Sequence, residues 1–178
     1  MARIMGQHWL QPDWDPGLTI AHLALSHLTA QGIEAAVLDV DRTLLPGRDV
    51  KLPEPVLAWL MDAKQGFSLH LFSNNPSRSR IAAVADQLDV NFTAAAGKPR
   101  RGALRRVLAD LDLPVDRVAM VGDRLFTDVL CGNRLGLYTV LVRPVRSDGT
   151  ACSQDRVQRL ERTLAAVSYT HLTLPTKA

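Results

Sequence analysis

The sequence predicts a three-layer α/β/α domain built on a mostly parallel sheet. Short apolar runs alternate with helical patterns along the chain, which is typical of strand–helix–strand units. Some runs are apolar throughout, as in Val118-Ala119-Met120-Val121, and this indicates strands that are covered on both faces. A length of 178 residues with 47% hydrophobic content suits one domain with its own core.

An N-terminal segment, residues 1–34, precedes the first expected strand. Its first half has few periodic cues, so we expect an irregular arm there. Thr19 is placed to cap a helix that continues to about Ala30, and Gly32 follows as its stop signal. We expect this arm and helix to pack on or beside the core.

Five strands and the helices between them are expected to form the core, residues 35–166. The strands are expected at 35–40, 67–72, 90–94, 118–121 and 138–142. The helices are expected to start near Pro53, Ser77, Pro99, Thr127 and Asp148. Proline at a helix start and glycine after its end set several of these boundaries.

Residues 167–178 differ from the arginine-rich segment before them. They have neither its charge nor its helical period. Their sequence resembles translated read-through of a sequencing adapter, so we expect a non-native tail and leave it out of the fold. A genomic locus that encodes these codons, or packing of the segment as an ordered element on the core, would contradict this interpretation.

The composition favours a cytoplasmic protein with anionic partners. No apolar run approaches the roughly 18 residues of a membrane-spanning helix, and the N-terminus lacks the pattern of a secretory signal. Lys and Arg outnumber Asp and Glu by 21 to 18, which is too small an excess to indicate specific nucleic-acid binding. The two cysteines have no metal-binding spacing and are expected to be inert.

The first expected strand runs directly into two carboxylates, Asp39 and Asp41, with Thr43 in the following turn. Strand alternation places the two aspartates on the same side, and ligands of open α/β sheets collect at such strand ends. Two neighbouring carboxylates repel each other unless a cation lies between them. Mg²⁺ prefers oxygen ligands of this kind, so the pattern predicts a metal and phosphate site.

Polar side chains also follow the next three expected strands. Ser73 and Asn74 follow the second, Lys98 follows the third, and Asp123 follows the fourth with Asp128 five residues later. All these ends lie on one edge of a parallel sheet. Residues that are distant in the sequence are therefore expected to converge there.

These motifs resemble those of the haloacid dehalogenase (HAD) superfamily of aspartate-based phosphotransferases. The matching strings, in order, are D-V-D-R-T at 39–43, S-N-N at 73–75, G-K-P at 97–99 and G-D-R-L-F-T-D at 122–128. Each is a weak signal alone, but four in order at these spacings are specific. The resemblance implies a Rossmann-like core and a Mg²⁺-dependent phosphomonoesterase.

The same resemblance implies roles for the acidic residues. Asp39 is expected to attack phosphorus and form an aspartyl-phosphate, and Asp41 to move protons to the leaving group and from water. Asp39, Asp123 and the backbone carbonyl of Asp41 are expected to ligate Mg²⁺. Asp128 is expected to act as a further ligand, directly or through water, or simply to favour a helix start.

Four more residues are expected to bind the phosphate or shape its site. Ser73 and Lys98 are expected to hold the phosphoryl oxygens as charge spreads over them. Thr43 is expected mainly to position its loop, with a phosphate contact second. Asn74 has two open interpretations, a substrate contact or a turn and helix cap.

The spacing of the motifs leaves no room for a large cap domain at either usual insertion point. An open site suits a phosphate on a bulky substrate. The chain also looks like the YqeG-type phosphatases of class IIIA, a group similar to the mitochondrial phosphatidylglycerophosphate phosphatase of phospholipid synthesis. The matching strings are L-Q-P-D at 10–13, D-R-T-L-L-P at 41–46, S-N-N at 73–75 and G-K-P at 97–99.

Several features are compatible with a phospholipid substrate and peripheral contact at the inner face of a membrane. Trp9, Trp14 and the first expected helix are placed to lie at an interface, or else to pack on the sheet. Arginines follow three of the motifs and are expected either near the phosphate or on solvated helix faces. They are Arg78, Arg80, Arg100, Arg101 and Arg124. Arg42 departs from the family pattern and is expected to alter head-group contacts.

Three alternatives remain beside this interpretation. The substrate can be a soluble sugar or nucleotide phosphate, since an oligomer can supply a lid. The chain can be a phosphorylatable receiver-like module, although a receiver lacks a nucleophile on the first strand and a further acidic motif on the fourth. A non-catalytic binding module is the third, disfavoured because every motif residue is present. The sequence does not predict an oligomeric state.

Overall fold

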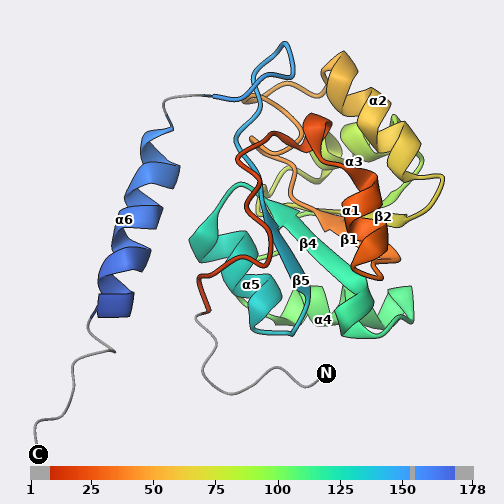
Figure 1. Cartoon of the computed structure of the whole chain (residues 1–178). Helices are drawn as coiled ribbons and strands as arrows, with labels where there is room; N and C mark the ends of the chain where they lie inside the picture. Colours follow the sequence, from red (N-terminus) through yellow and green to blue (C-terminus); the bar gives the residue numbers. More distant parts are fainter. Residues whose placement is uncertain (1–8, 153–154, 171–178) are drawn as a thin grey trace, which may run out of the picture.

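A five-stranded parallel sheet, ordered β3-β2-β1-β4-β5, forms the centre of the protein (Figure 1). It is seen in a computed structural model that describes residues 9–152 and 155–170. The sheet and its flanking helices confirm the α/β prediction. The strands are β1 (Ala35–Leu38), β2 (Ser68–Phe72), β3 (Asn91–Thr93), β4 (Val118–Gly122) and β5 (Tyr138–Leu141).

Helices connect the strands in the expected alternation. The α-helices are α1 (Leu25–Ala30), α2 (Glu54–Ala63), α3 (Arg78–Asp86), α4 (Gly102–Leu111), α5 (Leu130–Asn133) and α6 (Arg156–Thr170). Short 3-10 turns form η1 (Ile20–His22) and η2 (Val115–Arg117), and a π-helical turn forms η3 (Leu125–Val129). Two prolines at the start of α2 and the Ser77 cap of α3 are as the sequence predicts.

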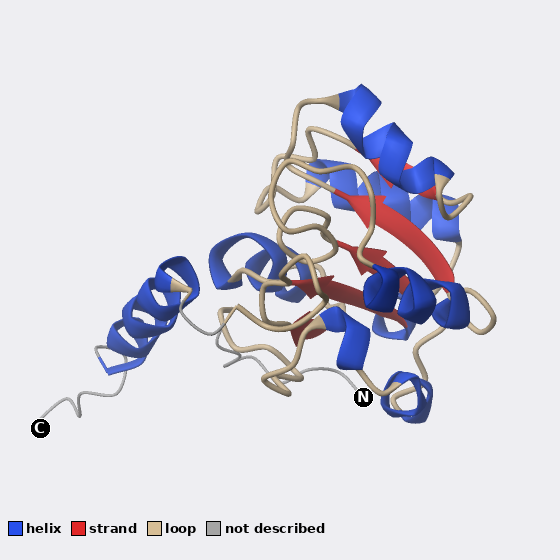
Figure 2. Cartoon of the chain, turned by 90° about the horizontal axis from the view of Figure 1, so that it is seen from above, coloured by secondary structure: helices blue, strands red, loops and turns tan. Residues whose placement is uncertain are grey.

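Successive residues of the central strands face two separate cores. In β1, Ala36 and Leu38 belong to one core with η1, α2 and α3, whereas Ala35 and Val37 belong to a second core with α4 and Cys131 of α5. Viewed from above, helices lie on both sides of the sheet (Figure 2). This double cover explains why the strands are apolar at consecutive positions.

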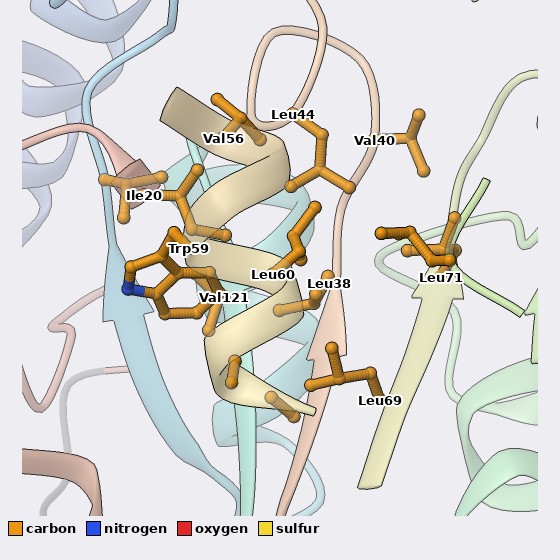
Figure 3. Packing of buried hydrophobic residues seen from close by; sticks show 14 of the residues in the cluster. Ile20, Leu38, Val40, Leu44, Val56, Trp59, Leu60, Leu69, Leu71 and Val121 are labelled. Atoms are coloured by element: carbon orange, nitrogen blue, oxygen red, sulfur yellow. The ribbon is translucent and has the colours of Figure 1, made fainter. Parts of the chain in front are cut away.

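Helix α2 packs directly over the middle of the sheet (Figure 3). Leu60 is fully buried in this core, in the same cluster as Leu38 and Val121 of the strands below. Trp59 also belongs to the cluster, and its indole Nε1 donates a hydrogen bond to the Leu23 carbonyl at 2.8 Å. The indole thereby fastens the N-terminal segment to the core without leaving a buried donor unsatisfied.

The predicted first helix, from Thr19 to about Ala30, is wrong as a continuous element. It is divided into η1 and α1 because the backbone at Leu23 and Ala24 is extended. The Leu23 carbonyl accepts from Trp59 instead of continuing a helix. The Thr19 hydroxyl donates to the carbonyl of Gly149 at 3.1 Å and does not cap η1. Tertiary hydrogen bonds therefore override the local pattern.

Two later helices also begin elsewhere than predicted. The chain near Asp148 forms a turn closed by a bridge between Val145 and Ala151, and α6 begins only at Arg156. Gly149 lies in this turn with a φ of +80°, a conformation that ends regular structure. The helix expected from Thr127 is preceded by the turn η3, which begins at Leu125.

The N-terminal arm follows the outer edge of the sheet beside β5. The amides of Asp13 and Trp14 donate to the carbonyl of Thr139, and Leu141 donates back to Trp14. Ile20 and Leu23 are buried in the core, so this segment packs on the sheet rather than presenting its apolar residues to solvent. Of the two tryptophans, only Trp9 is exposed, at 54%.

Helix α6 continues to Thr170, four residues past the expected domain boundary at 166. Residues 171–178 lie outside the described residues, so the adapter origin of the tail stays a prediction. So does the division into 1–34, 35–166 and 167–178. Among residues 9–152 and 155–170, no helix is long and apolar enough to cross a bilayer.

Replacing Leu60 tests the packing of α2 on the sheet. We expect Leu60→Ala to lower the free energy of unfolding by about 2–5 kcal/mol, because it leaves a cavity in a fully buried position. The neighbouring Met61 is exposed, so Met61→Ala is the control and is expected to change stability by less than about 0.5 kcal/mol. Urea denaturation followed by circular dichroism measures both, and equal effects would contradict the packing described.

Candidate active site

The site lies where the sheet changes its winding direction. The chain leaves β1 toward α2 on one face and leaves β4 toward α5 on the other, although β1 and β4 are neighbours. This arrangement opens a crevice at the carboxyl ends of the two strands, which is where open α/β sheets bind ligands. Asp39 follows β1 and Asp123 follows β4, so both enter that crevice.

Asp39 is the buried acidic group at the base of the crevice. Its Oδ1 accepts from Lys98 Nζ at 2.5 Å and its Oδ2 accepts from the hydroxyl of Thr43 at 2.9 Å. Burial raises the pKa of Asp39 to about 6, against the opposing effect of Lys98. Thr43 is fully buried and holds the carboxylate itself, which is consistent with the positioning role expected of it.

Lys98 is a buried cation between two carboxylates. Its ammonium group lies 2.5 Å from Asp39 Oδ1 and 2.8 Å from Asp128 Oδ1, and it donates to the carbonyl of Phe72 at 2.8 Å. Burial alone would lower the pKa of Lys98, but Asp128 and Asp39 outweigh it and raise the pKa above its ordinary value. The side chain therefore stays charged in the absence of solvent.

Asp39, Asp123 and Asp128 form a cluster that fits a metal ion. One carboxylate oxygen from each lies within 4.8 Å of the others, and all three residues are buried. Burial and the two neighbouring carboxylates raise the pKa of Asp123 to about 8. Asp123 Oδ2 and Asp128 Oδ1 are buried, and their contacts at the site are ion pairs with Arg42 at 3.2 Å and Lys98 at 2.8 Å. Oxygen atoms in this state suit a hard divalent cation.

Asp41 points toward a different set of partners. Its Oδ1 accepts from Arg80 at 2.6 Å, and its Oδ2 accepts from Ser73 Oγ at 3.1 Å and from Asn75 at 3.4 Å. Arg80 also donates to three backbone carbonyls of the loop 47–49. Asp41 thus stands at the edge of the cluster, with both carboxyl oxygens placed as acceptors.

Asn74 is directed at the backbone of Lys98. Its Oδ1 accepts from the Lys98 amide at 2.7 Å, and its Nδ2 donates to the Lys98 carbonyl at 3.1 Å. Of the alternatives, a helix cap is wrong, because Ser77 caps α3 and Asn75 accepts from the Ser77 amide. Asn74 therefore holds the loop that presents Lys98, and a substrate contact stays a prediction.

These residues line one small cavity of about 250 Å³. Its walls come from all four motifs, at the ends of β1, β2, β3 and β4. The lining residues are Asp39, Asp41, Arg42, Asn74, Lys98, Asp123, Arg124, Thr127 and Asp128. Ser73 is buried just behind Asp41, and the segments between the strands contain no inserted domain among the described residues.

Comparison with known proteins identifies the family. A model of HAD-hydrolase-like proteins matches residues 95–161. The Probable phosphatase YqeG of Bacillus subtilis (strain 168) is 30% identical over 149 residues, which cover 83% of this chain and 86% of that protein. The chain belongs to the YqeG family of HAD phosphatases.

Two further relatives agree with this membership. Phosphatidylglycerophosphate phosphatase 1, chloroplastic, of Chlamydomonas reinhardtii is 32% identical over 80% of this chain, which spans 56% of that protein. A crystal structure of a haloacid dehalogenase-like hydrolase from Brucella suis has a TM-score of 0.53 at 14% identity, over 76% of this chain and 99% of that one. The latter supports the HAD fold alone. A phosphatase of this family acts on a phosphorylated substrate, so the receiver-like and non-catalytic alternatives lose their support.

The arginines of this HAD phosphatase are distributed unevenly. Arg124 lines the cavity and Arg80 binds Asp41, but Arg78 lies over the ring of Phe92, away from the lining. Arg100 and Arg101 do not line the cavity. Arg80 and Arg124 are therefore at the site, whereas Arg78, Arg100 and Arg101 lie outside the cavity lining, so the two expected placements each apply to part of the set.

Arg42 lines the cavity and is held by two acidic residues. Its Nε lies 3.2 Å from Asp123 Oδ2, and its Nη2 pairs with Asp155, the residue before α6. Sequence reasoning noticed Arg42 but missed Asp155, which no motif marks. The α6 residues Gln158 and Glu161 were missed for the same reason.

Gly122 is required by the close approach of Asp128. A Cβ at this position would lie 2.3 Å from Asp128 Cγ, so no side chain fits without moving the carboxylate. We expect Gly122→Ala to lower the free energy of unfolding by about 1–3 kcal/mol and to weaken metal binding. Gly66→Ala is the control, because a Cβ there meets nothing within 4 Å. Denaturation and calorimetric titration measure the two effects, and a Gly122 variant that matches the control would refute this account.

Proposed function

We propose that this phosphatase is a Mg²⁺-dependent phosphomonoesterase that forms an aspartyl-phosphate on Asp39. The observation that carries the proposal is the convergence of Asp39, Asp123 and Asp128 around Lys98 at the crevice. Three buried carboxylates outnumber the two cations that contact them, Lys98 and Arg42, and this leaves a negative excess that a divalent cation would offset. The residues present therefore fit the cofactor that the family resemblance implies.

Asp39 is the proposed nucleophile. One of its oxygens attacks phosphorus, the bond from phosphorus to the leaving oxygen breaks, and an aspartyl-phosphate remains. Thr43 and Lys98 fix the orientation of this carboxylate before the attack. Mg²⁺, held by Asp39, Asp123 and the Asp41 carbonyl with Asp128 beside them, would supply charge neutralisation between the carboxylate and the phosphoryl group.

Asp41 is the proposed proton carrier. It gives a proton to the leaving oxygen and then takes one from the water that attacks the phosphoenzyme, whereupon the bond between phosphorus and Asp39 breaks. The acid form of Asp41 gives its proton to the leaving oxygen, and the carboxylate that remains takes one from water, so the acid form is restored at the end of the cycle. Its acceptor contacts to Ser73 and Arg80 suit the carboxylate that stands between the two steps. Ser73 and Lys98 are the proposed donors to the phosphoryl oxygens.

The proposed substrate is phosphatidylglycerophosphate, reached by peripheral contact with an anionic membrane. Two curated relatives carry the name phosphatidylglycerophosphate phosphatase, although this chain spans only 56% and 42% of their lengths. The absence of an inserted cap among the described residues leaves the cavity open to a phosphate on a large substrate. Arg124 at the cavity wall suits an anionic head group.

Replacing Asp39 tests the proposed chemistry. We expect Asp39→Asn to reduce hydrolysis of a generic phosphomonoester in Mg²⁺ to the background rate, because an amide oxygen is a poor nucleophile. Asp41→Asn is expected to lower kcat by about 10²–10⁴-fold. Asp62→Asn changes an exposed carboxyl of α2 and serves as the control. Activity of the Asp39 variant at the control's level, or full activity with the metal chelated, would refute the mechanism.

A comparison of substrates tests the lipid assignment. Phosphate release is measured from phosphatidylglycerophosphate in phosphatidylglycerol vesicles and from a panel of soluble sugar and nucleotide phosphates. We expect the highest kcat/KM for the lipid, since an uncapped site depends on the substrate to exclude water. A higher kcat/KM for any soluble phosphate would assign the enzyme to that compound instead.

A further inference from the structure

Helix α6 places buried polar side chains against the acidic cluster. It lies to the side of the sheet, beside the turn that leads into α5 (Figures 1 and 2). Gln158 and Glu161 are 2% and 8% exposed, whereas Leu160 of the same helix is 60% exposed. One apolar residue of the helix, Ala165, is also buried, in a small cluster with Leu125 and Val129. The buried polar groups therefore form a large part of the contact between α6 and the core.

Gln158 joins the ends of two neighbouring strands. Its Nε2 donates to the carbonyl of Asp123 at 2.8 Å and to the carbonyl of Val142 at 2.9 Å. Its Oε1 accepts from Arg143 at 2.6 Å, so the whole amide group is engaged. One of the two carbonyls belongs to Asp123 itself. The contact therefore fixes the peptide that carries a proposed metal ligand.

Glu161 supplies a hydrogen bond that the local sequence lacks. Leu125 begins the π-helical turn η3, and the amide of such a first residue has no partner within its own helix. The preceding residue, Arg124, makes no side-chain cap. Glu161 Oε2 accepts from the Leu125 amide at 2.9 Å in its place. A residue of α6 thus caps the turn that carries Asp128.

Asp155 completes the contact at the start of α6. Its Oδ1 accepts from the amide of Gln158 at 2.7 Å, which caps the helix, and its Oδ2 pairs with Arg42. Arg42 in turn lies beside Asp123 Oδ2. Asp155 just before α6, and Gln158 and Glu161 within it, therefore contact the segments that follow β1, β4 and β5, directly or through Arg42.

We propose that α6 is the positioning element of the metal site, in which Gln158 and Glu161 hold residues 123–125 so that Asp123 and Asp128 converge on Asp39. Neither residue touches the substrate; both act through the segment they bind. The inference rests on the proposed function in one respect, the binding of Mg²⁺. Without these contacts, the turn would have buried backbone groups unsatisfied and would move.

Four variants test this role. Gln158→Met keeps the length of the side chain without its donors, and Glu161→Ala removes the acceptor. Both are expected to bind Mg²⁺ about 10–100-fold more weakly in calorimetric titration, with a smaller loss of kcat at saturating Mg²⁺. Glu161→Gln retains an acceptor oxygen and is expected to restore affinity close to that of the unmodified protein. Thr163→Ala changes the exposed side of α6 and is the matched control.

Hydrogen exchange of residues 122–129, measured without metal, gives an independent readout. We expect faster exchange of the Leu125 amide in Gln158→Met and Glu161→Ala, but not in Glu161→Gln or Thr163→Ala. Unchanged exchange and unchanged Mg²⁺ affinity in the first two variants would overturn the proposal. A failure of the proposed function gives a distinguishable result. The unmodified protein would then bind no Mg²⁺, and the exchange pattern would still test the role of α6.

Discussion

The ammonium group of Lys98 is the interaction on which the site depends. Asp39 and Asp128 approach each other in a buried environment where like charges repel strongly, and Lys98 bridges the two at 2.5 and 2.8 Å. Its own position is fixed by Asn74, which binds both backbone polar groups of Lys98. Asn74 of the S-N-N motif thus positions Lys98 of the G-K-P motif, and Lys98 holds together the two aspartates of the first and fourth motifs.

The negative charge that Lys98 leaves on the cluster of Asp39, Asp123 and Asp128 is the second constraint on the site. Lys98 pairs with Asp39 and Asp128, and Arg42 lies beside Asp123, yet the three buried carboxylates still outnumber these two cations. Removing one partner from such a network leaves an uncompensated charge. An arrangement of this kind has a net negative charge in a buried environment, which favours protonation of a carboxylate or binding of a cation. That property connects its fold to the phosphatase chemistry of its family.

Much of this could be predicted from the sequence. Apolar runs followed by Asp39, Ser73, Lys98 and Asp123 predicted a parallel sheet with one polar edge. This was possible because each polar residue is close in sequence to the strand that precedes it. The structure brings those residues together. The first helix was mispredicted, since the break at Leu23 arises from a hydrogen bond to Trp59, thirty-six positions away. No window of local sequence contains that partner.

The sequence by itself determined the order of the motifs along the chain, the acidic residues at the strand ends and the family to which these motifs point. Strand ends and the polar residues that follow them are local features, which is why a sequence reveals them. Only the tertiary structure decided how the cluster is supported. Arg42 lines the cavity and also pairs with Asp123 and Asp155, contacts that no motif indicated, and Gln158 and Glu161 belong to no motif. The function of Gln158 and Glu161 depends on which face of α6 packs against the core. Contacts between segments that are distant in the sequence determine that orientation.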